Sequence, residues 1–264
     1  MKLENLTRRV EALCRTTGEF IRRERQVVSG SDIELKGLNS LVSYVDKRAE
    51  EMLVDGLRGL LPEAGFITEE DTPDEPNKDL RWVIDPLDGT TNYLHGIPVF
   101  AISVGLLNGE EELIGVVYEL GQKEMFSAWK DGGAWLNGKQ LKTDGSKKLK
   151  DTLIATGFPY HDFSRMESYM NLLQELFQQT RGVRRLGSAA TDLAYVACGR
   201  FDGFFEAGLS PWDVAGGSLL VKEAGGRVSD FSGDSNYIFG QEIIAASDSI
   251  FDDFLNLVRV RFSS

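Results

Sequence analysis

The segment WVIDPLDGTTN, residues 82–92, places two aspartates at the end of an apolar run. Its first residues are typical of a buried strand, and this strand carries Asp85 at its end. Pro86 is then expected to fix a turn, and Asp88 follows three residues after the first aspartate. Gly89 allows an unusual backbone conformation at the next position. The pattern therefore predicts two carboxylates that converge at one strand end, with the chain folding back around them.

A pair of carboxylates in a partly buried site is costly unless a divalent cation neutralises it, and hard cations prefer oxygen ligands. Thr90 and Thr91 add hydroxyl and backbone N–H groups beside the pair. Such groups can orient a water molecule or bind a phosphate oxygen. An Asx turn with solvated carboxylates is the alternative interpretation, and the Asp-x-x-Asp spacing alone does not decide between the two.

The composition of the chain narrows the function classes. The 264 residues include 29 Lys and Arg against 41 Asp and Glu, a formal net charge of −12, and 42% of them are hydrophobic. That apolar fraction is enough to build a substantial core, which excludes global disorder. The excess of carboxylate disfavours binding to nucleic acid or to an anionic membrane surface. Cations are the expected partners.

Histidine and cysteine are scarce. His95 and His161 are too few for a multi-histidine metal site, and Cys14 and Cys198 have no CxxC partner, so a zinc knot is excluded. Both cysteines are predicted to be buried thiols in a reducing compartment. A bound metal should therefore have oxygen ligands, as magnesium, calcium or manganese does. The first 20 residues have no continuous apolar core, which favours a cytoplasmic protein.

The pattern of apolar residues predicts the following elements. Helices are expected at 3–28, 41–61, 162–180, 187–199, 211–226 and 251–262. Strands are expected within 65–136, at 201–208 and at 243–247, and a polar hairpin or loop at 31–40. For the helix at 162–180 the predicted buried face consists of Met166, Tyr169, Met170, Leu173 and Leu176. This order of elements favours a layered α+β or α/β architecture over a bundle or a barrel.

Two more segments place acidic residues at the end or the start of a predicted element. FITEED places Glu69 and Glu70 at the end of an apolar run, and PWDVAGG places Asp213 beside Trp212 at the start of a helix. Taken singly, they would be an acidic loop and a capping aspartate.

Together, however, FITEE, WVIDPLDGTTN and PWDVAGGSLLVKEAGG resemble, in order and spacing, the motifs of the inositol monophosphatase family of magnesium-dependent, lithium-sensitive sugar phosphatases. The resemblance extends from Lys36 to the last strand. It implies an α/β fold, a layered α-β-α-β-α sandwich, with residues 1–264 as one catalytic unit. A subdivision is expected into 1–145, the helix pair and antiparallel sheet with most metal ligands, and 146–264, the α/β part with the substrate pocket and Asp213.

The resemblance also implies a set of metal ligands. One Mg²⁺ would be held by Glu69, Asp85 and the backbone carbonyl of Leu87. A second would be held by Asp85, Asp88 and Asp213, and Glu69 would contact a third, weaker ion. Two to three ions are therefore expected. Mn²⁺ is an alternative metal, and Li⁺ and Ca²⁺ are expected inhibitors.

The catalytic residues implied by the resemblance are Glu69, Thr90 and Asp46. The nucleophile would be a water near Glu69 and Thr90, and Asp46, in LVSYVD, would hydrogen-bond the threonine hydroxyl. Glu70 would support the neighbouring metal ligand, and Gly89 would help to hold the phosphate.

The substrate-binding residues are assigned by position in the same way: Asp88, Gly89, Thr90, Gly187, Ser188, Ala189, Glu206 and Asp213. Glu206 in FFEAG would accept hydrogen bonds from ring hydroxyls. The GSAA segment at 187–190 also fits the N-cap of a closely packed helix, and both roles can hold at once. Lys36 would approach a water near the metals, with a solvated surface lysine as the alternative.

The resulting prediction is an inositol-1-monophosphatase that releases inositol and phosphate by metal-activated water. Fructose-1,6-bisphosphatase, histidinol-phosphatase and other sugar or polyol phosphatases are the alternatives within the superfamily. The sequence DGTTNYLHG differs from the DGTKEF of members that act on nucleotide bisphosphates, which favours polyol monophosphates. A regulatory binding protein on the same scaffold is the alternative from another class. The expected partners are a phosphorylated polyol and a second copy of the chain, with no nucleic acid and no membrane.

Overall fold

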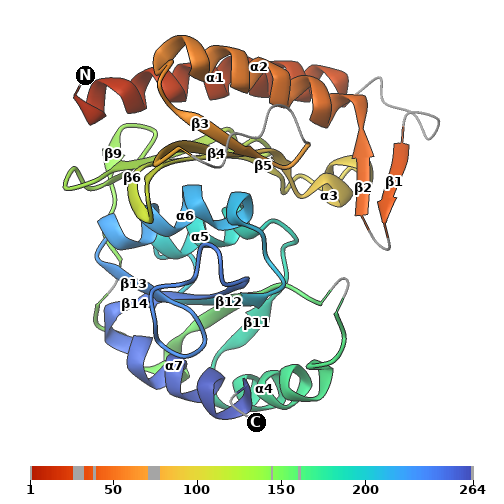
Figure 1. The fold of residues 1–264 in the computed structure, drawn as a ribbon. Coiled ribbons are helices and arrows are strands. Elements are labelled where there is room, and N and C mark those ends of the chain that lie inside the picture. Colours follow the sequence, from red (N-terminus) through yellow and green to blue (C-terminus); the bar gives the residue numbers. More distant parts are fainter. Residues whose placement is uncertain are drawn as a thin grey trace.

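The computed structural model describes residues 2–25, 33–37, 40–70, 78–143, 145–159 and 162–262, and only the backbone of 33–37 and 40–43. Its elements form five layers, which alternate between helix pairs and sheets (Figure 1). This is the predicted α-β-α-β-α sandwich, so the fold class is confirmed.

The first layer is formed by α1 (Leu3–Glu24) and α2 (Tyr44–Leu60), which pack on the first sheet. The helix predicted at 3–28 ends at Glu24 within the described residues, and positions 26–28 lie outside them. The helix predicted from residue 41 begins only at Tyr44. The preceding residues form β2 (Ser40–Ser43), which pairs antiparallel with β1 (Ile33–Gly37), so the start predicted for that helix was wrong and the hairpin is confirmed.

The first sheet has the order β3-β4-β5-β6-β7-β8-β9. Its strands are β3 (Gly65–Thr68), β4 (Leu80–Asp88), β5 (Ala101–Asn108), β6 (Glu111–Glu119), β7 (Glu124–Trp129), β8 (Ala134–Leu136) and β9 (Lys139–Gln140). β3 runs parallel to β4, and every later neighbour is antiparallel. The strand-rich segment 65–136 is thus confirmed, with one unpredicted helix, α3 (Thr90–Leu94), after β4.

The second sheet has the order β11-β10-β12-β14-β13. Its strands are β10 (Leu153–Thr156), β11 (Gly182–Arg184), β12 (Gly203–Ala207), β13 (Gly226–Ser229) and β14 (Glu242–Ser247). The central β12 and the neighbouring β14 correspond to predicted strands. The other three were missed because segments of three or four residues are too short to show a period.

Two helix pairs cover the second sheet. Between the sheets lie α5 (Ala189–Ala197) and α6 (Pro211–Glu223), and the outer face carries α4 (Met166–Gln179) and α7 (Asp248–Phe262), as Figure 1 shows. A short 3₁₀ turn at Leu149–Asp151 precedes β10. None of the described helices is long and apolar enough to cross a bilayer.

The predicted buried face of α4 needs one correction. Tyr169, Leu173 and Leu176 are buried as expected, and Leu172 joins them, but Met170 is 54% exposed. Met170 lies one residue beyond Tyr169, and a single residue step turns the side chain by about 100°, away from the sheet.

The central helices share one hydrophobic core with both sheets. This core includes Val83 and Val117 of the first sheet, Leu193 of α5, Leu219 of α6 and Phe204 of the second sheet. The sheets change over between β9 and β10, around the predicted boundary at 145, and the subdivision itself stays a prediction. Of the two free cysteines, Cys14 is buried and Cys198 only partly so. The N-termini of α5 and α6 meet the end of β4 at one edge of this core.

Candidate active site

A β-bulge turns Asp85 and Asp88 toward the same side of β4. Asp85 pairs with Ser103 and Asp88 with Ala101, so three steps along β4 oppose two along β5. In a regular strand, residues three apart face opposite sides, and the extra residue of a bulge reverses this relationship. Pro86 lies inside the bulge, where its missing N–H is tolerated. The turn predicted at Pro86 is therefore wrong, because the strand continues to Asp88.

The chain reverses one residue later, at Gly89. This glycine has a left-handed φ of 87°, and a Cβ there would lie 3.0 Å from the Val99 carbonyl oxygen and 3.1 Å from that of Gly187. Both conformation and space therefore require glycine. The expected unusual backbone is confirmed, and α3 starts immediately afterwards.

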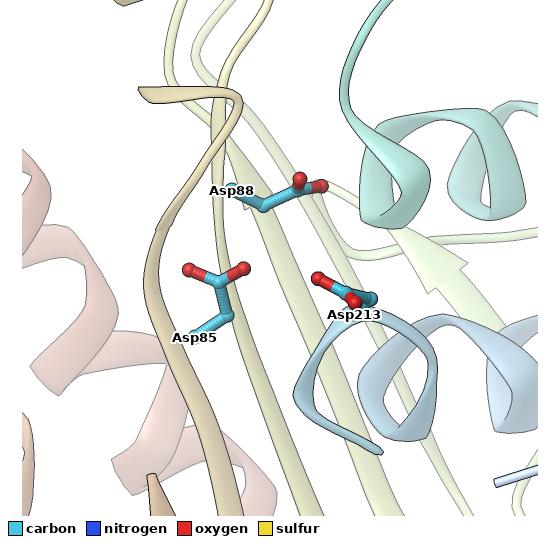
Figure 2. A group of neighbouring side chains, drawn as sticks. All are labelled: Asp85, Asp88 and Asp213. Atoms are coloured by element: carbon cyan, nitrogen blue, oxygen red, sulfur yellow. The ribbon is translucent and has the colours of Figure 1, made fainter. Parts of the chain in front are cut away.

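Asp213 meets the two strand aspartates from the first turn of α6 (Figure 2). Its Oδ2 accepts a hydrogen bond from the Ser210 backbone N–H at 2.6 Å, as part of a capping box. The capping interpretation is thus confirmed, yet the same residue also belongs to the acidic cluster. One carboxylate oxygen from each of Asp85, Asp88 and Asp213 lies within 4.8 Å of the others.

Hydrogen bonds also fix the direction of the other two carboxylates. Asp85 Oδ1 accepts from the Leu87 backbone N–H at 2.8 Å. Asp88 Oδ2 accepts from the Ser188 hydroxyl at 2.6 Å and from the Ala190 backbone N–H at 2.7 Å. Each aspartate is therefore oriented through one oxygen, which leaves the second oxygen to serve as a ligand.

The cluster is electrostatically strained without a cation. Burial raises the pKa of Asp85 well above its usual value, and the charges of Glu69, Asp88 and Asp213 raise it further. Burial also raises the pKa of Asp88 to about 6, although hydrogen bonds from Ser188 and the α5 backbone oppose the shift. The pKa of Asp213 is raised by desolvation and by Asp88. Three converging oxygen ligands with raised pKa values fit a hard divalent cation such as Mg²⁺.

Glu69 and Glu70 follow β3 directly and bring a fourth carboxylate to the site. Glu69 lines the cavity together with Asp88 and Asp213. The Glu70 backbone N–H donates to Glu50 Oε2 at 2.8 Å, which ties the end of β3 to α2.

Thr90 connects the strand end to α2 in a similar way. Its hydroxyl lies 3.0 Å from Asp46 Oδ1 and 2.9 Å from the Leu87 carbonyl oxygen, both within hydrogen-bonding distance. Asp46 is buried in the first turn of α2. The hydrogen bond expected between these two side chains is therefore present.

A cavity of about 680 Å³ opens over the cluster. Predicted site residues that line it are Glu69, Asp88, Gly89, Thr90, Gly187, Ser188, Ala189, Glu206 and Asp213. Asp46 and Leu87 hydrogen-bond Thr90, Asp85 belongs to the aspartate cluster, and Glu70 follows Glu69 in the chain. Lys36 lies in β1, and its side chain is outside the described residues, as is all of His161. His95 caps the end of α3, is exposed and does not line the cavity.

Another part of the cavity wall is formed by β12 and by the start of α5, which packs against Gly89. Ser188 is the N-cap of α5 and its hydroxyl accepts from the Thr191 N–H at 3.3 Å, which confirms the capping role of the GSAA segment. Glu206 is buried on β12, and this burial, with the charge of Asp88, raises its pKa to about 8, against an opposing effect of Arg185.

Several residues of the site were missed from the sequence. Glu50 is fully buried, one helical turn after Asp46. The sequence does contain a signal for Glu50, because it falls on the apolar face of an amphipathic helix. A carboxylate that is buried on such a face requires a partner. Asp192 is buried on α5, but it does not lie in a pattern that distinguishes it from a surface charge. Arg185 also lines the cavity.

Comparison with known proteins agrees with this geometry. The model of the inositol monophosphatase family matches residues 2–260. The chain is similar to Nus factor SuhB of Escherichia coli (strain K12), with 42% identity over 251 residues, or 94% of each chain. It is 40% identical over 248 residues to an inositol-1-monophosphatase of Mesorhizobium japonicum, covering 94% of this chain and 93% of that one. A crystal structure of extragenic suppressor protein suhB from Bartonella henselae matches with a TM-score of 0.89 and 36% identity, over 94% and 96% of the two chains. The chain belongs to the inositol monophosphatase family.

Proposed function

We propose that this protein is a Mg²⁺-dependent phosphomonoester hydrolase and, more specifically, an inositol-1-monophosphatase. The observation that carries the proposal is the convergence of Asp85, Asp88 and Asp213 within 4.8 Å, at a cavity large enough for a cyclic polyol phosphate. Membership of the inositol monophosphatase family supports the reaction class. The similar inositol-1-monophosphatase of Mesorhizobium japonicum supports the substrate.

In this proposal one Mg²⁺ is held by Glu69, Asp85 and the Leu87 carbonyl, and a second by Asp85, Asp88 and Asp213. Glu69 also contacts a third, weaker ion. When bound, Mg²⁺ supplies positive charge that binds the phosphate oxygens and makes water a stronger acid. We further propose that Mn²⁺ can substitute and that Li⁺ and Ca²⁺ inhibit.

The residues of the chain orient the water and the phosphate. The Thr90 hydroxyl donates to Asp46, so its lone pairs are left to accept a hydrogen bond from the attacking water. Glu69 lines the same cavity and can take part in removing the water proton. Gly89 is left-handed and directly precedes α3, and the N–H groups of the first turn of α3 would bind the phosphate.

The alcohol portion of the substrate would be bound where β12 and the start of α5 line the cavity. Glu206 accepts hydrogen bonds from the hydroxyls of the polyol, and Gly187, Ser188 and Ala189 contact the ring. A global charge of −12 repels a phosphate ester, so binding depends on cations that invert the field inside this cavity.

The decisive experiment compares kcat/KM for myo-inositol 1-phosphate, fructose 1,6-bisphosphate, histidinol phosphate and adenosine bisphosphate, each with Mg²⁺ and with excess chelator. The expected result is the highest kcat/KM for the inositol ester and no turnover in chelator. Full turnover in chelator would overturn the metal mechanism, and a higher kcat/KM for another ester would reassign the substrate. Asp88→Asn should abolish turnover with the fold intact.

A second candidate function is favoured by one observation: the relatives that share 42% identity with this chain are named Nus factor SuhB. A regulatory binding role can coexist with the phosphatase site. Affinity purification of the chain and of its inactive Asp88→Asn variant tests it, since a binding role predicts the same macromolecular partner with both. We also propose a cytoplasmic homodimer, to be tested by cell fractionation and by light scattering.

A further inference from the structure

We propose that Gly157 and Tyr169 are positioning residues that fix the carboxylate of Glu206, and thereby select substrates whose alcohol carries hydroxyl groups. This inference rests on the proposed function of Glu206 as the acceptor for polyol hydroxyls. It adds two residues that belong neither to the metal cluster nor to the predicted substrate-binding set.

Gly157 provides the space in which the Glu206 carboxylate lies. A Cβ at position 157 would be 1.8 Å from Glu206 Oε1, 1.9 Å from its Cδ and 2.1 Å from its Oε2. The carboxylate therefore packs directly over the glycine Cα. Conformation does not explain this glycine, because its φ lies outside the left-handed region that Gly89 and Gly187 occupy in the same cavity. Space for Glu206 is what position 157 supplies.

The sheet register brings the two residues together. Thr156, the last residue of β10, pairs with Phe205 of β12, and the next residues along these parallel strands are Gly157 and Glu206. Glu206 is only 6% exposed but lines the cavity, so a displaced carboxylate would turn into that space. Any side chain at position 157 would force the carboxylate out of this place.

Tyr169 holds the glycine from α4. Its hydroxyl donates to the Gly157 carbonyl oxygen at 2.7 Å and lies 3.1 Å from Thr156 Oγ1. Its ring packs at 5.8 Å from that of Phe205, the residue before Glu206. The same tyrosine thus fixes both strands that place the carboxylate, and it lines the cavity beside Gly157 and Glu206.

Re-aiming Glu206 should affect the alcohol side of the substrate more than the phosphate side. The phosphate is bound at the aspartate cluster, whereas Glu206 contacts the hydroxyls of the leaving alcohol. When the carboxylate is displaced, the substrate loses its hydrogen bond to Glu206, which corresponds to a fall in affinity of about tenfold.

The test is Gly157→Ala, measured with myo-inositol 1-phosphate and with p-nitrophenyl phosphate, whose alcohol has no further hydroxyls. Because the three atoms nearest to the added methyl all belong to the end of the Glu206 side chain, the fold should be retained. We expect the KM for the inositol ester to rise about tenfold more than the KM for the aryl ester. Tyr169→Phe should also raise the ratio of the KM for the inositol ester to the KM for the aryl ester. Gly59→Ala is the matched control, since a Cβ there meets no atom within 4 Å.

A double-mutant cycle links the effect to Glu206. In a Glu206→Ala background the three atoms nearest to the added methyl are absent, so Gly157→Ala should cause no further change in the KM ratio. A persistent effect there, an equal loss for both esters, or a crystal structure of Gly157→Ala with an unmoved Glu206 carboxylate would overturn the inference. If Glu206→Ala leaves the ratio of the two KM values unchanged, the proposed role of Glu206 as acceptor for the polyol hydroxyls fails too. A silent Gly157→Ala beside an impaired Glu206→Ala overturns the positioning role alone.

Discussion

The hydroxyl of Thr90 lies 3.0 Å from Asp46 Oδ1, and this contact joins the start of α3 to the buried face of α2 across 44 positions of the sequence. The same hydroxyl lies 2.9 Å from the carbonyl oxygen of Leu87. Of the two acceptors, the carboxylate forms the stronger bond. Asp46 therefore decides where the hydroxyl proton points.

Removing the Thr90 hydroxyl should slow the chemical step. We expect Thr90→Ala to lower kcat by about 10²-fold, the usual contribution of one positioned proton-transfer group. Thr90→Ser keeps the hydroxyl and should remain close to the wild-type kcat. Both are measured at saturating Mg²⁺ and myo-inositol 1-phosphate. A wild-type kcat for Thr90→Ala would remove Thr90 from the water-orienting role.

The acidic cluster should make the metal-free protein sensitive to pH. Its folded-state pKa values are raised above the unfolded values, to about 6 for Asp88 and upward for Asp85 and Asp213. Their contribution to stability is thus fully present below about pH 4, the unfolded pKa, and is lost as the pH rises through the folded values. In chelator, Asp213→Asn should unfold at a higher temperature than wild type, with a difference that grows between pH 5 and pH 8.

Mg²⁺ should reverse the order of the two unfolding temperatures, so that wild type unfolds at the higher one. An ion that binds only to the folded state stabilises that state. Wild type, which has all three aspartates, should therefore gain more stability from Mg²⁺ than Asp213→Asn does. Thermal unfolding of both proteins, with chelator and with Mg²⁺, measures the effect. If Asp213→Asn were less stable than wild type in chelator at pH 8, the aspartates would not repel one another as the geometry indicates.

How far the site could be predicted depends on whether its residues are contiguous in the chain. Asp85 and Asp88 lie within one motif, so their proximity followed from the sequence itself. The means by which they face one side did not, because a bulge depends on the pairing of β4 with β5, and the sequence of β4 alone does not show that pairing. For the same reason the turn at Pro86 was predicted wrongly.

The same distinction between contiguous patterns and long-range pairing applies to the fold. Long amphipathic helices such as α1 and α4 were found from their period, whereas β10, β11 and β13 have three or four residues each and were missed. Gly157 follows one of these missed strands. Its importance depends on the pairing of β10 with β12, which places it beside Glu206.

Glu50 offers a test of the support behind the metal ligands. Its Oε2 accepts from the Glu70 N–H at 2.8 Å and so fixes the segment that carries Glu69. We expect Glu50→Ala to raise the Mg²⁺ concentration for half-maximal activity by about 10- to 100-fold, as for other residues that orient metal ligands. Activity should recover at high Mg²⁺.

Its neighbour Glu51 provides the control. Glu51 is exposed and pairs with Arg48 on the surface of α2, so Glu51→Ala removes the same charge from the same helix without touching the site. Its Mg²⁺ requirement should match wild type. Equal shifts for both variants would mean that the overall charge, and not the hydrogen bond to Glu70, sets the metal affinity.

Ser188 connects helix capping to the direction of a metal ligand. Its hydroxyl donates to Asp88 Oδ2 at 2.6 Å and accepts from the Thr191 N–H at 3.3 Å. Ser188→Ala loses both bonds, and the lost cap alone should lower the free energy of unfolding by about 0.5–2 kcal/mol.

The loss from the missing cap should be the same with and without metal. The freed Asp88, by contrast, binds metal less well, so the stabilisation that Mg²⁺ adds should also shrink. Unfolding in chelator and in Mg²⁺ separates the two effects, and Ser188→Thr should restore both. A loss of equal size under both conditions would assign Ser188 to capping alone.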